Sequence, residues 1–147
     1  MDELKLELIE SDDITCFDFI VDGKSLHSLL YPEEANYPQP QAPPVSCLNA
    51  MYQDEELQKA LDSLLLRRRA DFPDNRRALY VCPMCGDLGC GAETAVIEEG
   101  ENTITWRNFG RENTYEDNVD RHEEVGPFVF DKAQYVATWK DLLALLT

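Results

Sequence analysis

Three short apolar segments separated by turn residues restrict what the second half of this chain can fold into. Residues 78–82 read ALYVC, residues 94–98 read TAVIE and residues 103–109 read TITWRNF. These segments are rich in the β-branched and aromatic residues that favour strands. Residues 99–102 (EGEN) join the last two segments as a hairpin turn. The pattern predicts a meander of three antiparallel strands.

The first half of the chain adds two more predicted strands. Residues 4–8 (LKLEL) alternate apolar and polar side chains, which is typical of a half-buried strand. Residues 14–21 (ITCFDFIV) form a second strand segment that is rich in β-branched and aromatic residues. Asp22-Gly23 predicts a turn, and the leucines in residues 26–30 have the spacing of a short helix.

Two longer helices are expected. Residues 53–69 carry leucines at helical spacing and end in three arginines, which complement the helix dipole. Asp131 is a predicted cap for a second helix that runs to residue 146, directly after a short strand at 127–130. The polar, acidic residues 110–126 are expected to form a loop. The fold class predicted is α+β, with an antiparallel sheet packed against two main helices.

The length of 147 residues is typical of one domain, predicted here to span residues 1–147. Residues 31–44 contain five prolines and are expected to form an extended loop. The roughly 30 residues before this loop are too few to build a separate core. We therefore interpret the Pro-rich stretch as a loop within one domain.

The charge balance narrows the possible partners. The chain has 29 Asp plus Glu against 13 Lys plus Arg, a net charge of -16. This charge disfavours nucleic acid and anionic membranes and favours a basic protein, although it can also serve solubility alone. The chain opens with charged residues where a signal peptide would be apolar, and no apolar run reaches the roughly 18 residues that span a bilayer. A cytoplasmic protein is expected.

Acidic residues gather near aromatic ones between residues 106 and 124. An acidic face with aromatic anchors is the kind of surface that docks on a basic protein, although it can also be a solvated surface. The candidate contact residues are Trp106, Phe109, Glu112, Tyr115, Glu116, Asp117, Asp120, Glu123 and Glu124.

Five cysteines in a chain without an export signal are not expected to form a disulfide framework. Cys16 and Cys47 lie among apolar residues and are expected to be buried thiols. Cys82, Cys85 and Cys90 stand in the sequence CPMCGDLGC, whose first part has the form of a zinc knuckle. Three interpretations stay open: a zinc site, a redox pair of Cys82 and Cys85, and inert thiols in a Gly-rich turn.

A structural zinc site needs four ligands, so a fourth would have to come from elsewhere in the chain. The candidates are His27, His122, Cys16, Cys47 or a carboxylate. His27 is expected on the short helix at the edge of the core, and His122 in a solvated loop. Known catalytic motifs such as GxSxG or a P-loop do not occur. We nominate no catalytic residue and do not expect an enzyme.

Three segments resemble a family of small, mostly uncharacterised bacterial proteins. They are VCPMCGDLGCGA (Val81 to Ala92), TWRNFGRENTYE (Thr105 to Glu116) and GPFVFDKAQY (Gly126 to Tyr135). The match covers roughly the second half of the chain. The label oxidoreductase that is sometimes attached to this family rests on the cysteines alone.

In size and charge the chain also resembles the immunity proteins of bacterial toxin systems, including contact-dependent inhibition. The resemblance implies an antitoxin that neutralises a cognate toxin, often a basic nuclease, by stoichiometric binding. This is the function we predict, with no required cofactor. The alternatives are a small zinc-binding domain and, further behind, a thiol oxidoreductase.

Overall fold

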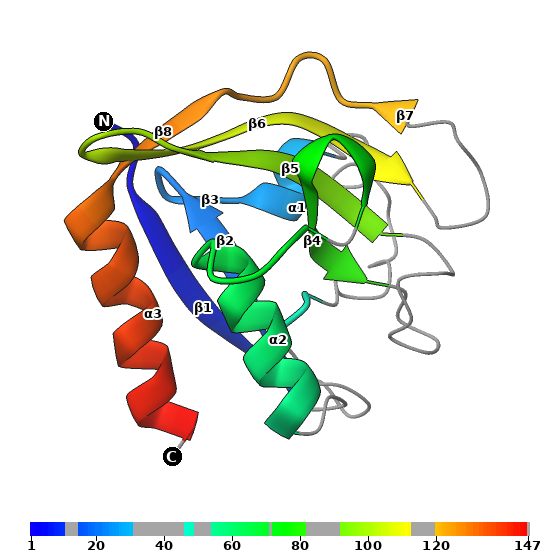
Figure 1. Ribbon diagram of the computed structural model, residues 1–147. Helices are drawn as coiled ribbons and strands as arrows, with labels where there is room; N and C mark the ends of the chain where they lie inside the picture. Colours follow the sequence, from blue (N-terminus) through cyan, green and yellow to red (C-terminus); the bar gives the residue numbers. More distant parts are fainter. Residues whose placement is uncertain are drawn as a thin grey trace.

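The computed structural model describes residues 1–10, 15–30, 46–48, 54–70, 72–81, 92–112 and 120–146. Two antiparallel sheets face each other, and the two longer helices, α2 (Asp54–Leu64) and α3 (Lys132–Leu146), lie beside them (Figure 1). The predicted α+β fold class is confirmed. Within the described residues, we find no helix with the length and apolar character to span a membrane.

The first sheet has the order β1-β2-β3, formed by β1 (Leu4–Glu10), β2 (Thr15–Val21) and β3 (Lys24–Ser25). Asp22 and Gly23 join β2 to β3 with φ angles of 52° and 83°. Asp and Gly accept such positive φ angles most readily, so the predicted turn is confirmed. The short helix α1 (Leu26–Leu30) follows β3, also as predicted.

The second sheet contains the predicted meander. It consists of β4 (Arg76–Val81), β5 (Ala92–Glu99), β6 (Thr103–Glu112), β7 (Asp120–Arg121) and β8 (Phe128–Asp131), preceded by the 3-10 turn η2 (Pro73–Asn75). The far edge of β6 pairs with β8 near its start and with β7 near its end. The prediction of a loop over residues 110–126 was therefore wrong at 110–112 and at 120–121, because backbone pairing continues through polar residues.

Isolated backbone contacts join the two sheets into a closed ring. On one side, the Phe17 amide donates to the Leu48 carbonyl at 3.0 Å, and the Cys47 amide donates to the Leu79 carbonyl at 2.9 Å. On the other side, the Asp2 amide donates to the Val129 carbonyl at 2.8 Å. Residues 46–48 thus connect β2 to β4, and Asp2 connects the start of β1 to β8. This closure brings the first and last strands of the chain together.

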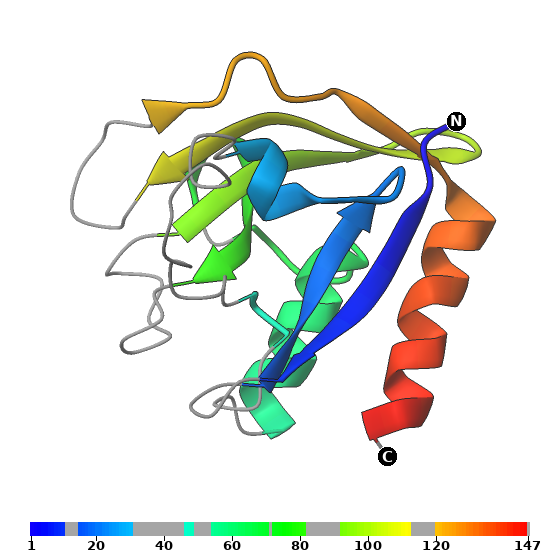
Figure 2. The ribbon, with the colours of Figure 1, turned by 180° about the vertical axis from the view of Figure 1, so that it is seen from behind.

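The main helices are α2 (Asp54–Leu64) and α3 (Lys132–Leu146), and α3 runs alongside β1 (Figures 1 and 2). Helix α2 ends earlier than the predicted residue 69. Leu66 has a φ of 60°, and the Arg67 amide donates to the Asp62 carbonyl at 2.7 Å. This is a Schellman ending. The Asp131 cap of α3 is confirmed, because its carboxylate accepts the Gln134 amide at 3.0 Å.

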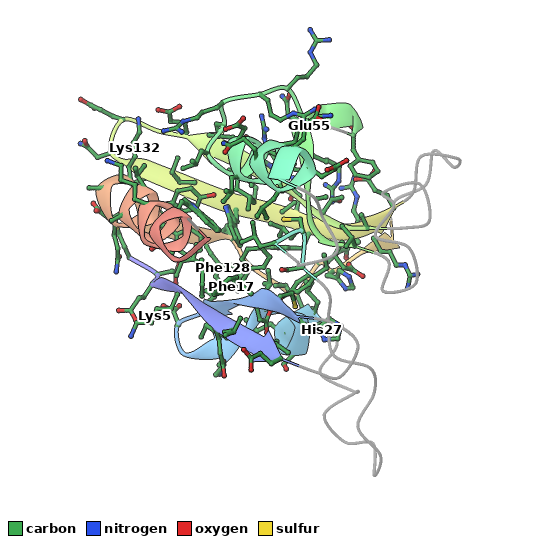
Figure 3. All side chains as sticks on the ribbon, turned by 90° about the horizontal axis from the view of Figure 1, so that it is seen from below. Lys5, Phe17, His27, Glu55, Phe128 and Lys132 are labelled. Carbon is green, nitrogen blue, oxygen red and sulfur yellow. The ribbon has the colours of Figure 1, made fainter. Side chains whose placement is uncertain are left out.

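Large aromatic side chains fill the space between the sheets and helices. Trp106 meets Phe19, Phe130 and Tyr135 edge-on, with ring centroids 5.3–6.1 Å apart. The Tyr135 hydroxyl donates to the Leu64 carbonyl at 2.6 Å and so ties α3 to the end of α2. Phe17 and Phe128, labelled in Figure 3, pack against this core from opposite sheets. The core thus draws on residues before and after the Pro-rich stretch.

A buried carboxylate lies where β2, β3 and β4 meet. Asp18 accepts the Tyr80 hydroxyl on one oxygen and the Ser25 hydroxyl, at 2.6 Å, on the other. The Tyr80 hydroxyl in turn accepts the His27 amide at 3.1 Å. Burial and the adjacent Asp18 carboxylate raise the pKa of Tyr80 well above its ordinary value. Burial likewise raises the pKa of Tyr135.

These two tyrosines should make stability fall in alkaline solution. Above pH about 10, the tyrosines of the unfolded chain ionise while Tyr80 and Tyr135 stay protonated in the fold. The folded state then binds more protons, so the free energy of unfolding should drop by about 1.4 kcal/mol per pH unit for each. Urea unfolding between pH 8 and 11 measures this slope.

Tyr80→Phe is the matched variant for that experiment. It should be less stable than the parent at neutral pH, because the Tyr80 hydroxyl bond to Asp18 is lost. Its stability should also fall less steeply above pH 10. A phenolate absorbance titration in which all six tyrosines ionise while the chain is still folded would contradict the expectation.

Candidate functional site

A cavity of about 700 Å³ opens between the first sheet and the segment that joins β7 to β8. One wall comes from the β2–β3 turn and helix α1, and the other comes from residues about 100 positions later in the chain. The lining residues are Val21, Asp22, Lys24, Leu29, Leu30, Arg121, His122, Glu123, Glu124, Val125, Gly126 and Phe128. No motif in the sequence joins these two stretches, so their meeting is a result of the tertiary fold.

The cavity is lined by apolar residues, which we call its floor, and by exposed charged residues, which we call its rim. Val21 and Leu30 are buried, and Leu29, Val125 and Phe128 pack partly buried against the main core. Around this floor lie three exposed acids and two basic residues: Asp22, Glu123, Glu124, Lys24 and Arg121. Apolar pockets with a few polar groups at defined places are typical of binding sites.

The carboxylate of Asp22 is held in place by the start of β1. One of its oxygens accepts the Glu3 amide at 2.8 Å, and the Asp22 amide donates back to the Glu3 carbonyl at 2.9 Å. The hydrogen bond from Glu3 is the main cause that lowers the pKa of Asp22 below its ordinary value. This rim position therefore keeps its negative charge in mildly acidic solution.

The opposite wall, which we call the β7–β8 segment (residues 122–127), is fixed to β6 and β5. The His122 amide donates to the Phe109 carbonyl at 2.9 Å. The His122 Nε2 atom lies 3.0 Å from a carboxylate oxygen of Glu93, and the His122 side chain is only 17% exposed. The prediction of a solvated loop histidine was wrong, because the partner Glu93 comes from a strand far away in sequence.

Gly126 brings the backbone of this segment close to the ring of Phe109. Its φ is +76°, and a Cβ at this position would lie 2.9 Å from Cε2 of Phe109. Phe109 also contacts Phe128 edge-on, with ring centroids 5.7 Å apart. A second cavity of about 250 Å³ shares five lining residues with the larger one: Arg121, His122, Glu123, Val125 and Gly126.

Gly126→Ala should destabilise the protein more than Gly23→Ala does. Both glycines have positive φ, which costs alanine roughly 1 kcal/mol or more, but a Cβ on Gly23 would meet nothing within 4 Å. The difference between the two variants in chemical denaturation therefore isolates the clash with Phe109, and we expect about 1–3 kcal/mol more loss at Gly126. Equal losses would mean that Phe109 moves aside freely.

The structure removes three residues from the predicted contact face. Trp106 and Phe109 are 0% and 1% exposed, and Glu112 is buried with its carboxylate 2.9 Å from Nε of Arg76. Strand β6 turns Trp106 and Phe109 toward the core, so neither ring offers a surface to a partner. Glu123 and Glu124 are exposed at the rim of the cavity.

The remaining predicted contacts are only partly covered by the structure. Asp120 lies in β7, where its backbone pairs with Arg111. Tyr115, Glu116 and Asp117 lie outside the described residues. The sequence did not indicate that Asp22, Leu29 and Phe128 line the same cavity as Glu123 and Glu124. The sequence predicts the Asp22-Gly23 turn, but it does not indicate that Asp22 lines a cavity together with the β7–β8 segment.

The basic residues after helix α2 have internal roles. The Arg77 guanidinium donates to the carbonyls of Ser63 at 3.0 Å and Arg68 at 2.8 Å, and it thereby caps the C-terminal end of α2. Arg76 instead pairs with Glu112 inside the sheet.

The candidate zinc ligands Cys82, Cys85 and Cys90 lie outside the described residues. Cys16 and Cys47 are buried, as predicted, and burial raises the pKa of the Cys16 thiol. A protonated thiol is a poor nucleophile and a poor metal ligand. Across the part of the chain that the structure describes, no three His, Cys, Asp or Glu side chains are grouped to hold a metal ion.

We compared the chain with known proteins in three ways. No model of a known protein family matches it, and neither the curated proteins nor the solved structures gave a match.

Proposed function

We propose that this protein is a cytoplasmic immunity-type protein that neutralises a basic toxin by stoichiometric binding through an acidic surface. Its target could be a nuclease, whose substrate surface must itself be basic to hold nucleic acid. The proposal rests on the charge of the chain and on the site, together with the resemblance in size and charge to the immunity proteins of toxin systems.

The observation that carries the proposal is the exposed acid around an apolar cavity. Glu123, Glu124 and Asp22 come from two distant parts of the chain and share one rim. Many of the basic side chains are meanwhile engaged within the protein. Arg76 and Arg77 are buried, while Lys5, Lys59, Arg107 and Lys132 each pair with a glutamate.

This distribution leaves the outer field of the protein negative, in line with the net charge of -16. Such a field would attract a basic partner from a distance and raise the rate of association. The apolar floor would then supply contacts that slow dissociation. Because exposed charges are screened by salt, the association rate should fall as ionic strength rises.

The test begins with tagged protein as bait in an extract of the native cell at low salt. A basic protein that is retained at a one-to-one ratio, and released by high salt, is then purified and assayed for its own activity. Activity that falls linearly to zero as one equivalent of this protein is added supports the proposal. A captured protein whose activity is unchanged would refute it.

Two double variants distinguish binding through the cavity rim from attraction by the overall negative charge. Glu123→Gln/Glu124→Gln changes the rim, and Glu55→Gln/Glu56→Gln makes the same change of charge on the exposed start of helix α2. Only the first should weaken inhibition. Glu55 lies far from Phe128, which lines the cavity (Figure 3). An empty capture at low salt would count against the proposal, and zinc content would then be the next measurement.

A further inference from the structure

We propose that the 700 Å³ cavity binds an arginine of the basic partner together with an apolar residue next to it in the partner's chain. This inference rests on the proposed function and names the chemistry of its contact. Each part of the cavity sets one requirement for the occupant.

The floor selects an apolar or long aliphatic group. Leu29, Val125 and Phe128 are partly buried and pack on the core, so they present apolar surface beside the opening. The methylene stem of an arginine covers such surface while its charged end stays at the rim. The cavity is larger than one side chain and lies within the usual range of ligand pockets, about 300–1,000 Å³. A neighbouring apolar residue can therefore enter with the arginine.

The charged residues of the rim favour an occupant with a single positive charge. Glu123 and Glu124 line the cavity from one wall and Asp22 from the other, and carboxylates bind a guanidinium with two parallel hydrogen bonds. Lys24 and Arg121 lie on the same rim. A run of several basic residues would meet these two cations, whereas one arginine flanked by apolar residues would not. The arrangement therefore favours a single cation.

The Asp22 carboxylate, and the backbone segment that carries Glu123 and Glu124, are held in position before a partner arrives. The Glu3 amide bonds the Asp22 carboxylate, and Glu93 holds His122, which directly precedes Glu123 in sequence. Gly126 packs against Phe109 at the other end of the same segment. A site that is already ordered loses less conformational entropy on binding, so its contacts yield more affinity.

The experiment uses the full chain and a peptide probe, acetyl-Leu-Arg-Leu-amide, followed by amide chemical shifts in NMR. We expect saturable shifts confined to residues 21–30 and 121–128. Glu123→Gln/Glu124→Gln should weaken the fitted affinity by roughly fivefold or more, as the loss of two ion pairs implies. The matched variant Glu55→Gln/Glu56→Gln should leave it unchanged.

Two further probes separate the requirements. Acetyl-Leu-Glu-Leu-amide should produce no saturable shift at the cavity, and acetyl-Arg-Arg-Arg-amide should bind there more weakly than the Leu-Arg-Leu peptide. Shifts of the Leu-Arg-Leu peptide that spread over remote exposed acids such as Glu7 and Glu101 would overturn the inference. Equal affinity of the Leu-Glu-Leu peptide would overturn it as well.

The outcomes for the cavity and for the proposed function are distinguishable. If a toxin is captured and inhibited but the Glu123→Gln/Glu124→Gln variant inhibits equally well, the function stands and the cavity is not its contact. If the peptide binds the cavity as expected and no basic protein is captured, the chemistry of the site stands and the immunity function fails.

Discussion

Arg76→Met is expected to lower the free energy of unfolding by about 3–5 kcal/mol, because it leaves a carboxylate buried without its cation. Arg76 is 4% exposed, and its Nε atom lies 2.9 Å from Glu112 and 3.1 Å from the hydroxyl of Thr94. The Thr94 hydroxyl donates to the same Glu112 oxygen at 2.7 Å. After the substitution, Thr94 alone cannot balance the desolvated charge. Urea unfolding at pH 7 measures the loss.

The double variant Arg76→Met/Glu112→Leu is the control for this prediction. Replacing both charges by apolar groups of similar size removes the unpaired ion, so the double variant should be more stable than Arg76→Met alone. A loss below about 1 kcal/mol for Arg76→Met would show that water reaches Glu112 and that the pair is not truly buried.

Trp106→Ala is also expected to lower the free energy of unfolding by about 3–5 kcal/mol. The Trp106 ring is 0% exposed, and Phe19, Phe130 and Tyr135 surround it. Its indole nitrogen also donates to the Tyr135 hydroxyl at 3.3 Å. Removing the ring leaves a cavity at the centre of the aromatic core, which the surrounding strands can only partly close. Thermal and chemical unfolding both measure the effect.

The same variant separates stability from binding. Where the Trp106→Ala protein is still folded, it should bind the partner as the parent does, because the ring has no outer surface. Leu8→Ala is the control, since Leu8 is 48% exposed and its truncation should cost less than about 1 kcal/mol. If folded Trp106→Ala protein failed to bind the partner, Trp106 would have to be part of the contact face.

Local sequence patterns determined most of the secondary structure. Alternation and β-branched composition identified β1, β2 and the meander β4-β5-β6, and Asp131 marked the start of α3. These features depend on interactions between residues close in sequence, such as turn conformation and helix capping. The errors lie where pairing with distant residues decides the outcome, as in the late end of β6 and the existence of β7.

The candidate site was only partly predictable for the same reason. The sequence indicated an acidic region that includes Glu123 and Glu124, and both are exposed as a contact surface requires. The sequence could not show that Trp106 and Glu112 are buried while Glu123 and Glu124 are exposed. Local composition does not reveal which side of a strand faces the core or which buried charge has a partner.

The sequence by itself determined β1, β2 and the meander β4-β5-β6, the Asp22-Gly23 turn, the cap of α3 and the negative charge, because each follows from residue type and local spacing. Only the tertiary structure decided that Glu112 pairs with Arg76 and that Glu93 holds His122. It also decided that Asp22 and Glu123 line the same cavity. These contacts join residues between 29 and about 100 positions apart. They arise from the closed ring of strands, whose geometry no local pattern encodes.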